Sequence, residues 1–419
     1  METAPSRFGL KALNFFIAAI EAGFGPFVAV WLTQQGWSQT DVGLALSIGA
    51  GAGLIGQLPG GFAVDQVHHK RPILTVALLA IAAAALLIAF APMVGPVWLA
   101  EALNSLASCI VTPAIAAITL RLCGHSAYSE RLGVNARYSS LGAASAAGFF
   151  GLCAWYASQR SVFIAAAALV VPALIALHTI RASDEAEGEE HHALLHPRER
   201  RRRRAQARRI FRQPALHVFA VCAVLFHLAN AAMLPLALNE LAKRTTTAGL
   251  AVSAAIIVPQ IVVATISPWA GSMAQLLGRR PVLLIGFAAL PLRGVLFALL
   301  TWAGPTAVPL VAIQLLDGVS AAVFGLSLPL IAADVTKTTG FMNLAIGSLG
   351  LATSLGATAS TTLAGIVADM LSTPVAFVGL AAIGMAAWMT LLLAMPETRP
   401  EGHGGTPAAG FAVAGTQRA

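Results

Sequence analysis

Runs of about twenty apolar residues recur along the chain, and they constrain its fold more than any other feature. A helix needs about 20 apolar residues to cross the ~30 Å hydrocarbon core of a bilayer. Of the 419 residues, 57% are hydrophobic and only 11% are charged, which is more apolar surface than a soluble core could bury. Twelve such runs predict membrane-spanning helices at residues 9–32, 42–64, 72–90, 96–120, 132–155, 162–180, 215–241, 248–270, 281–301, 305–332, 343–367 and 374–395.

The continuity of these runs distinguishes a helical membrane protein from a β-barrel. Outer-membrane β-barrels have alternating segments of about ten residues, whereas the runs here are unbroken. Residues 1–7 lead straight into a full-length span without a small-residue cleavage site, so we expect no cleavable signal peptide. The expected fold class is an all-α membrane protein.

The distribution of positive charge predicts the orientation of the spans. With the N-terminus inside, all but four of the 26 Lys and Arg residues fall on the inner side. The exceptions are Arg160, Lys243 and Arg244 on the outer side and Arg293 within a span. By the positive-inside rule, we expect both termini in the cytoplasm and the chain in a bacterial inner membrane.

One long hydrophilic segment divides the chain. It begins SDEAEGEEHH (183–192) and continues HPRERRRRRAQARRIFRQ (196–213). Nucleic-acid binding is one interpretation of such a run, but a linker beside anionic lipid headgroups is simpler, so we expect no nucleic-acid partner. His191, His192 and His196 could bind a metal, yet no Cys accompanies them and we expect no metal site. The predicted units are a six-helix bundle (1–180), a cytoplasmic linker (181–213), a second six-helix bundle (214–396) and a disordered cytoplasmic tail (397–419).

The two halves repeat each other. Glu21 and Pro26 precede Asn230 and Pro235 by the same offset, and NARYSSLGAASAAG (135–148) matches NLAIGSLGLATSLG (343–356) at almost the same spacing. Internal repeats of this kind are typical of secondary transporters, whose substrate sites lie near the midplane between the halves.

Two loops carry a family resemblance. GFAVDQVHHKRP (61–72) and GSMAQLLGRRP (271–281) resemble the G-x-x-x-D-R-x-G-R-R loop of the major facilitator superfamily, and MPETRP (395–400) resembles the family's exit from its last span. The resemblance implies twelve helices in two pseudo-symmetric six-helix bundles. It also implies a gating role for Asp65, with topology as the alternative interpretation, which we favour for Lys70 and Arg71. The predicted gating-loop residues are Gly61, Asp65, Lys70, Arg71, Gly271, Gly278, Arg279 and Arg280.

In this superfamily spans 1, 4, 7 and 10 line the central cavity, and all four carry polar residues here. The most regular stripe, from Glu101 to Thr112, follows one face of span 4. The substrate-cavity candidates are Asn14, Asn104, Ser105, Ser108, His227, Asn230, Gln314 and Ser320. Hydrogen bonds that only join helices are the alternative for the hydroxyl groups, and packing is the alternative for His227.

Four ionisable residues within the spans are candidates for proton coupling: Glu21, Glu101, Arg293 and Asp317. A charge at mid-bilayer costs about 2.5–3.5 kcal/mol on insertion scales, so such residues face a cavity or a partner. Arg293 and Asp317 lie at similar depth in spans 9 and 10 and are expected to pair. They resemble the arginine and carboxylate of the lactose permease group; the alternative is a static salt bridge.

Together these features predict a secondary active transporter that moves a small organic solute by alternating access with protons. Uptake and efflux are not distinguished, with a slight preference for efflux. Motifs of membrane enzymes and of nucleotide-driven pumps are absent from the sequence, so we expect neither enzymatic activity nor a cofactor. We expect a monomer in the bilayer. A receptor or sensor, or a lipid flippase or scramblase on the same scaffold, remains the alternative.

Overall fold

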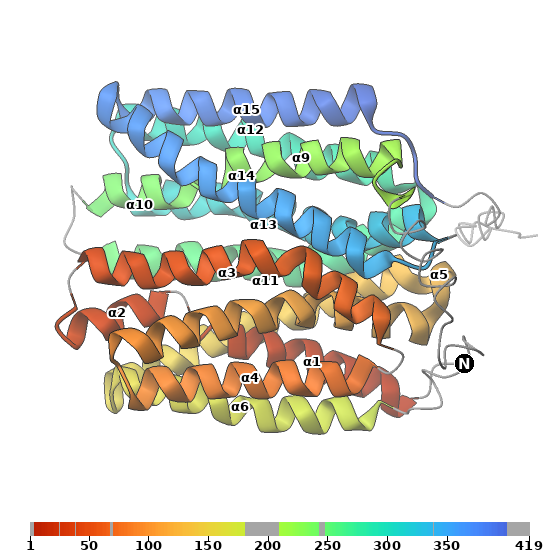
Figure 1. Cartoon of the computed structure of the whole chain (residues 1–419). Helices are drawn as coiled ribbons and strands as arrows, with labels where there is room; N and C mark the ends of the chain where they lie inside the picture. Colours follow the sequence, from red (N-terminus) through yellow and green to blue (C-terminus); the bar gives the residue numbers. More distant parts are fainter. Residues whose placement is uncertain are drawn as a thin grey trace, which may run out of the picture.

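The computed structural model describes residues 4–399 except 25, 38, 68–69, 181–208, 243–247 and 338. The linker histidines and most of its arginines, Lys243, Arg244 and the tail beyond residue 399 therefore lie outside the described residues. Within them the chain is helical and contains no strand (Figure 1). The helices are α1 (Ala4–Glu21), α2 (Pro26–Gln34), α3 (Gln39–Gln66), α4 (Lys70–Phe90), α5 (Val94–Tyr156), α6 (Gln159–Thr179), α9 (Pro214–Asn230), α10 (Met233–Ala242), α11 (Ala248–Leu276), α12 (Arg279–Ala303), α13 (Ala307–Thr336), α14 (Met342–Met370) and α15 (Thr373–Ala394).

By length and composition, nine of the described helices are able to cross a membrane. One of them, α5, has 63 residues and holds two spans, because Gly124 leaves the helical conformation with φ 67°. Helices α1–α2 and α3 complete the twelve spans. The predicted spans 96–120 and 132–155 leave a loop between residues 120 and 132. The structure corrects this: helix continues on both sides of Gly124, whose missing β-carbon permits the positive φ.

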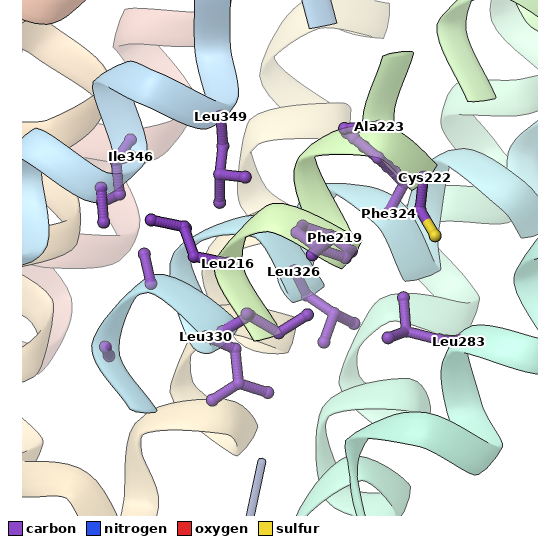
Figure 2. Close-up of a cluster of buried hydrophobic side chains, with 14 of the residues drawn as sticks. Leu216, Phe219, Cys222, Ala223, Leu283, Phe324, Leu326, Leu330, Ile346 and Leu349 are labelled. Atoms are coloured by element: carbon purple, nitrogen blue, oxygen red, sulfur yellow. The ribbon is translucent and has the colours of Figure 1, made fainter. Parts of the chain in front are cut away.

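The helices form two bundles that lie side by side (Figure 1). Helices α1–α6 make the N-terminal half and α9–α15 make the C-terminal half, and the halves meet where α3 packs on α14 and where α5 packs on α11 and α13. In the C-terminal half, the side chains of α9 interlock with α12, α13 and α14; Phe219 and Leu283 belong to this core (Figure 2).

One face of the assembly gathers positive charge. We call the face at which α1, α4, α9, α12 and α14 begin the basic face, because Arg7, Lys70, Arg131, Arg279 and Arg280 lie there. In Figure 1 it is the end where the N-terminus lies. Its concentration of Lys and Arg is the pattern from which the sequence analysis expected a cytoplasmic side.

The first span of each half is broken at corresponding positions. Helix α1 ends at Glu21 and α2 begins at Pro26, while α9 ends at Asn230 and α10 begins at Met233. The predicted spans 9–32 and 215–241 were continuous, so these breaks are a correction. Their physical cause is proline, because Pro26 and Pro235 lack an N–H group and clash with the preceding turn. Paired interruptions in corresponding spans are a pointer to a transporter's binding site.

Four glycines let the halves approach each other near the basic face. A β-carbon on Gly61 or Gly347 would collide with the carbonyl oxygen of Asn343 or Gln57, across the α3–α14 contact. Gly133 and Gly271 make the same kind of approach between α5 and α11. The two seams lie on corresponding helices of the repeat. The backbones therefore pack tightly at this level, as small residues allow between membrane helices.

Candidate functional site

Two cavities, each lined partly by polar residues, lie between the halves. The smaller, about 340 Å³, is enclosed by α1, α5, α11 and α13, and the larger, about 510 Å³, by α3, α5, α13 and α14. Thr112 and Leu328 line both cavities, so the two spaces adjoin at these side chains. Cavities of a few hundred Å³ lined by helices of a bundle suit a small organic molecule.

The smaller cavity extends along α1 to the end of that helix. Glu21, the last residue of α1, lines it and is exposed to its space, together with Asn14 on the same helix. Asn14 is oriented by its Nδ2, which donates to the Leu10 carbonyl oxygen at 2.8 Å, and its Oδ1 accepts from Ser139 at 3.4 Å. Across the described residues, the Glu21 carboxylate has no hydrogen bond or ion pair. It is thus a free acceptor inside the bundle.

The opposite wall of this cavity comes from α5. Asn135 and Ser139 line it, and the Asn135 Nδ2 donates to Thr119 Oγ1 at 3.0 Å. Sequence reasoning did not select these residues as cavity candidates, although both stand in the segment NARYSSLG that marks the repeat. That segment was the signal that could have identified them.

The polar stripe of span 4 faces the larger cavity. Asn104, Ser105, Ser108 and Thr112 line it; the first three are among the substrate-cavity candidates, and that role stays a prediction. The facing walls come from Gln57 on α3 and from hydroxyl-bearing residues of α14, which sequence reasoning missed: Thr353, Ser354 and Thr358. Short hydroxyl side chains in glycine-rich helices give no periodic signal that separates a cavity wall from helix packing.

Glu101 lies behind the wall of the larger cavity. Glu101 is only 6% exposed, and its Oε1 atom has no hydrogen-bond partner. A β-carbon added to Gly49, which lines the cavity, would come within 2.9 Å of Glu101 Oε2. The carboxylate therefore lies next to Gly49 and Ser105, which line the cavity, but does not line it itself.

The predicted ion pair of spans 9 and 10 is present in the structure. Arg293 on α12 donates through Nη1 to Asp317 Oδ1 at 2.5 Å and also to Asn230 Oδ1. Its Nη2 donates to Gln314 Oε1 at 2.6 Å, and Gln314 in turn donates to the Ala255 carbonyl oxygen at 3.1 Å. Arg293 is 1% exposed. Its charge is neutralised within the C-terminal half, beside the break that ends α9.

The candidates on α9 and α13 lie apart from the walls of the two cavities. Asn230 and Gln314 accept from Arg293, as described. Ser320 is 1% exposed and donates to the Asp317 carbonyl oxygen at 3.0 Å. His227 packs edge-on against Phe324, with ring centroids 4.9 Å apart, which is the packing interpretation left open above.

Asp65 closes the α3–α14 seam at the basic face. Its Oδ1 accepts from the backbone N–H of Asn343 at 3.2 Å and from Asn343 Nδ2 at 2.7 Å, and its Oδ2 accepts from the Leu344 N–H at 2.8 Å. The carboxylate thus caps the N-terminus of a helix in the other half, where unsatisfied N–H groups and the helix dipole favour a negative charge. At the second seam no carboxylate takes part: Ser129 donates to Gln275 Oε1 at 3.0 Å, and Arg137 Nε donates to the Ala264 carbonyl oxygen at 2.9 Å.

The remaining loop residues act within their own halves. Lys70 caps the end of α3 by donating to the Val64 carbonyl oxygen at 2.6 Å, and Arg71 is partly buried at the start of α4. Gly278 has φ 107° and leads into Arg279, which pairs with Asp334 on α13 at 2.9 Å.

The segment after the last span completes this network. The backbone N–H groups of Arg279 and Arg280 donate to the two Glu397 oxygens at 2.8 and 3.1 Å. Arg399 donates to the Leu276 carbonyl oxygen at 2.7 Å. Glu397 therefore caps α12 and Arg399 caps α11, and both contacts fasten the C-terminal half without crossing to the other.

No group of three or more potential metal-ligating side chains was found within the described ranges.

Twelve spans in two repeat-related halves, with polar cavities between them and a glycine-tight seal at one face, define a carrier-type membrane protein. The chain matches the model of the Major Facilitator Superfamily over residues 12–238 and 219–417. The chain belongs to that superfamily, and its predicted fold is confirmed. Members of the family are transporters and not enzymes.

Similar proteins agree with this assignment. An uncharacterised MFS-type transporter of Mycobacterium tuberculosis, found in two strains, is 33% identical over 407 residues, which cover 93% of each chain. Three solved structures share the fold. The human organic anion transporter MFSD10 gives a TM-score of 0.71 at 15% identity, covering 93% of this chain and 100% of that one. The Escherichia coli fucose:proton symporter FucP gives 0.69 at 15%, covering 92% and 97%. The proton:xylose symporter XylE gives 0.72 at 13%, covering 94% and 95%.

Proposed function

We propose that this transporter moves a small organic solute by alternating access and couples that movement to protons. The observation that carries the proposal is the pair of cavities between the halves. At the basic face, seams of close backbone contact separate these cavities from the surroundings. The Asp65 cap and the glycine contacts all join one half to the other. A tilt of the halves that separates the two seams would therefore open the cavities to the basic face. Such rigid-body motion is how repeat-built transporters alternate access.

Two sites are suited to carry protons. Glu21 is a carboxylate without a partner in the smaller cavity, and Asp317 is held by Arg293 in a cluster that movement of α12 against α13 would open. A carboxylate loses its proton when a cation approaches within ~4–6 Å and regains it when desolvated alone. Solved relatives of the same fold include the fucose and xylose proton symporters, which favours coupling to protons over other ions.

We place the basic face in the cytoplasm of a bacterial inner membrane, with the protein acting as a monomer. The positive-inside rule favours this orientation. The similar mycobacterial transporter supports a bacterial membrane.

The test is reconstitution of the full chain into proteoliposomes that contain a trapped pH dye. Addition of a transported solute is expected to move protons across the membrane, and an imposed pH gradient is expected to drive solute accumulation. The same vesicles carrying fluorescent lipid test the alternative activities. Lipid exchange between leaflets without solute-dependent proton movement would replace the proposal with a scramblase, and tight solute binding without flux would favour a receptor.

A further inference from the structure

The walls of the two cavities carry charge of one sign. Among the described residues that line them, Glu21 is the only acidic residue, and there is no Lys, Arg or His. Arg293 is absent from both walls and is paired with Asp317. Arg137, which follows a residue of the smaller cavity's wall, directs its Nε to the Ala264 carbonyl oxygen of α11 at 2.9 Å. The space in which a solute would sit therefore faces a carboxylate and no cation.

Two buried acceptors without partners lie at or beside the wall of the larger cavity. Asn104 lines the larger cavity, and its buried Oδ1 has no hydrogen bond; Glu101 Oε1, next to the same wall, has none either. A buried acceptor left unpaired is costly, and a carboxylate can only accept hydrogen bonds while it is ionised. A ligand with an ammonium group would be attracted by the Glu21 carboxylate, whereas an anion would meet that carboxylate and no cation.

Aromatic side chains are also missing from the described walls of both cavities. Cations that lack N–H groups are commonly bound by aromatic faces. The walls instead offer hydroxyl and amide groups, as on Ser105, Ser108 and Thr112.

From these features, and resting on the proposed transport function, we infer that the solute is a protonated, hydroxyl- or amide-bearing aliphatic amine whose ammonium group is bound by Glu21. Its polar body occupies the larger cavity beyond Thr112 and Leu328. Anionic solutes and cations without N–H groups are not expected as substrates.

The experiment compares matched molecules that differ in charge. Glucosamine, glucose and glucuronate share one ring, and 4-amino-1-butanol, 1,4-butanediol and succinate share one chain length; tetraphenylphosphonium supplies an aromatic cation without N–H groups. Affinities are measured by microscale thermophoresis on the full chain in nanodiscs, and flux is measured in proteoliposomes. The amine of at least one set is expected to bind on the order of tenfold more tightly than its neutral and anionic counterparts, as one charge-assisted contact would give.

Variants assign the preference to Glu21. Glu21→Gln is expected to abolish it, Glu21→Asp to retain it, and Asp369→Asn, which removes an exposed carboxylate at the end of α14, to leave it unchanged. Equal or better binding of the neutral, anionic or aromatic probes overturns the inference, as does failure of both amines to bind or an amine preference that survives in Glu21→Gln. Amine binding that depends on Glu21 but occurs without flux upholds the inference and overturns the proposed transport. Flux of an anion upholds transport and overturns the inference.

Discussion

Replacing Asp65 with asparagine should loosen the seal at the basic face. Asp65 is the second-last residue of α3, where a negative charge faces the unfavourable end of its own helix dipole. That local cost is offset across the interface, because the carboxylate accepts three N–H groups at the start of α14. Its stabilisation therefore exists only while the halves are closed at this face.

The size of the effect follows from these contacts. Hydrogen bonds to a charged group contribute about 1.5–3 kcal/mol and neutral ones about 0.5–1.5 kcal/mol. Asparagine keeps an acceptor oxygen but loses the charge, and its own amide would face the donors of α14. Since neighbouring contacts are not additive, we expect a net loss of about 1–2 kcal/mol from the closed state. That corresponds to a roughly 5- to 30-fold change in the ratio of the two conformations.

Spin labels can measure this ratio in a cysteine-free background. A pair at Phe8 and Lys337 reports on the basic face, and a pair at Gln35 and Leu371 reports on the opposite face; all four side chains are exposed. In Asp65→Asn the first distance should lengthen and the second should shorten, as populations shift toward opening at the basic face.

The control for Asp65→Asn is Glu130→Gln, which removes an exposed carboxylate from the same face and should leave both distances unchanged. Identical distance distributions in Asp65→Asn and the parent protein would refute a gating role for Asp65. The residue would then serve topology alone.

Four further predictions follow from the site. Glu21→Gln should abolish solute-driven proton movement in proteoliposomes while changing thermal stability little; wild-type coupling would contradict its role. Arg293→Ala should lower the free energy of unfolding by about 3–5 kcal/mol, because it strands a buried carboxylate, and adding Asp317→Asn should recover most of that loss without restoring coupling; restored coupling would make the pair purely structural. Gly347→Val should push α14 off α3 and shift both spin-label distances as Asp65→Asn does; unchanged distances would show that the seam is not tight. Glu397→Gln should weaken the cap of α12 by about 0.5–2 kcal/mol in denaturant unfolding, and an unchanged midpoint would contradict the capping role.

Much of the fold could be predicted because the bilayer limits the options. Every backbone polar group in the hydrocarbon core must be satisfied within the segment, so the apolar runs of about twenty residues are helical, although two of them are broken. The partner of Arg293 was predictable because an unpaired charge in the bilayer is costly. A buried arginine needs a carboxylate at its own depth, and Asp317 is the acid at that depth in the next span. The prolines that break the first span of each half were visible, but a proline inside a transmembrane helix is often tolerated, so the breaks could not be inferred from it.

The cavity walls were harder to predict than the spans. The stripe from Asn104 to Thr112 stands out because polar residues recur on one helical face, whereas Gln57 and Thr353 lie in helices where glycine and hydroxyl residues are scattered. Their role depends on which face of α3 meets which face of α14, and that is set by the close approach at Gly61 and Gly347. A contact between residues almost three hundred positions apart leaves no local pattern.

The two halves are similar in their backbone contacts but differ in the positions of their charged residues. Corresponding helices of the repeat supply the glycines of both seams. The two seams are thus equivalent, as expected if both open in one movement of the halves. At the equivalent broken spans, however, Glu21 stands unpaired in a cavity while Asn230 accepts from Arg293, whose charge Asp317 cancels. A symmetric pair of carboxylates would bind a solute equally to either half. If the solute is the inferred amine, its ammonium group would stay with Glu21 in the N-terminal half. The C-terminal half, whose Arg293 is already paired with Asp317, would then move without breaking an ion pair to the solute.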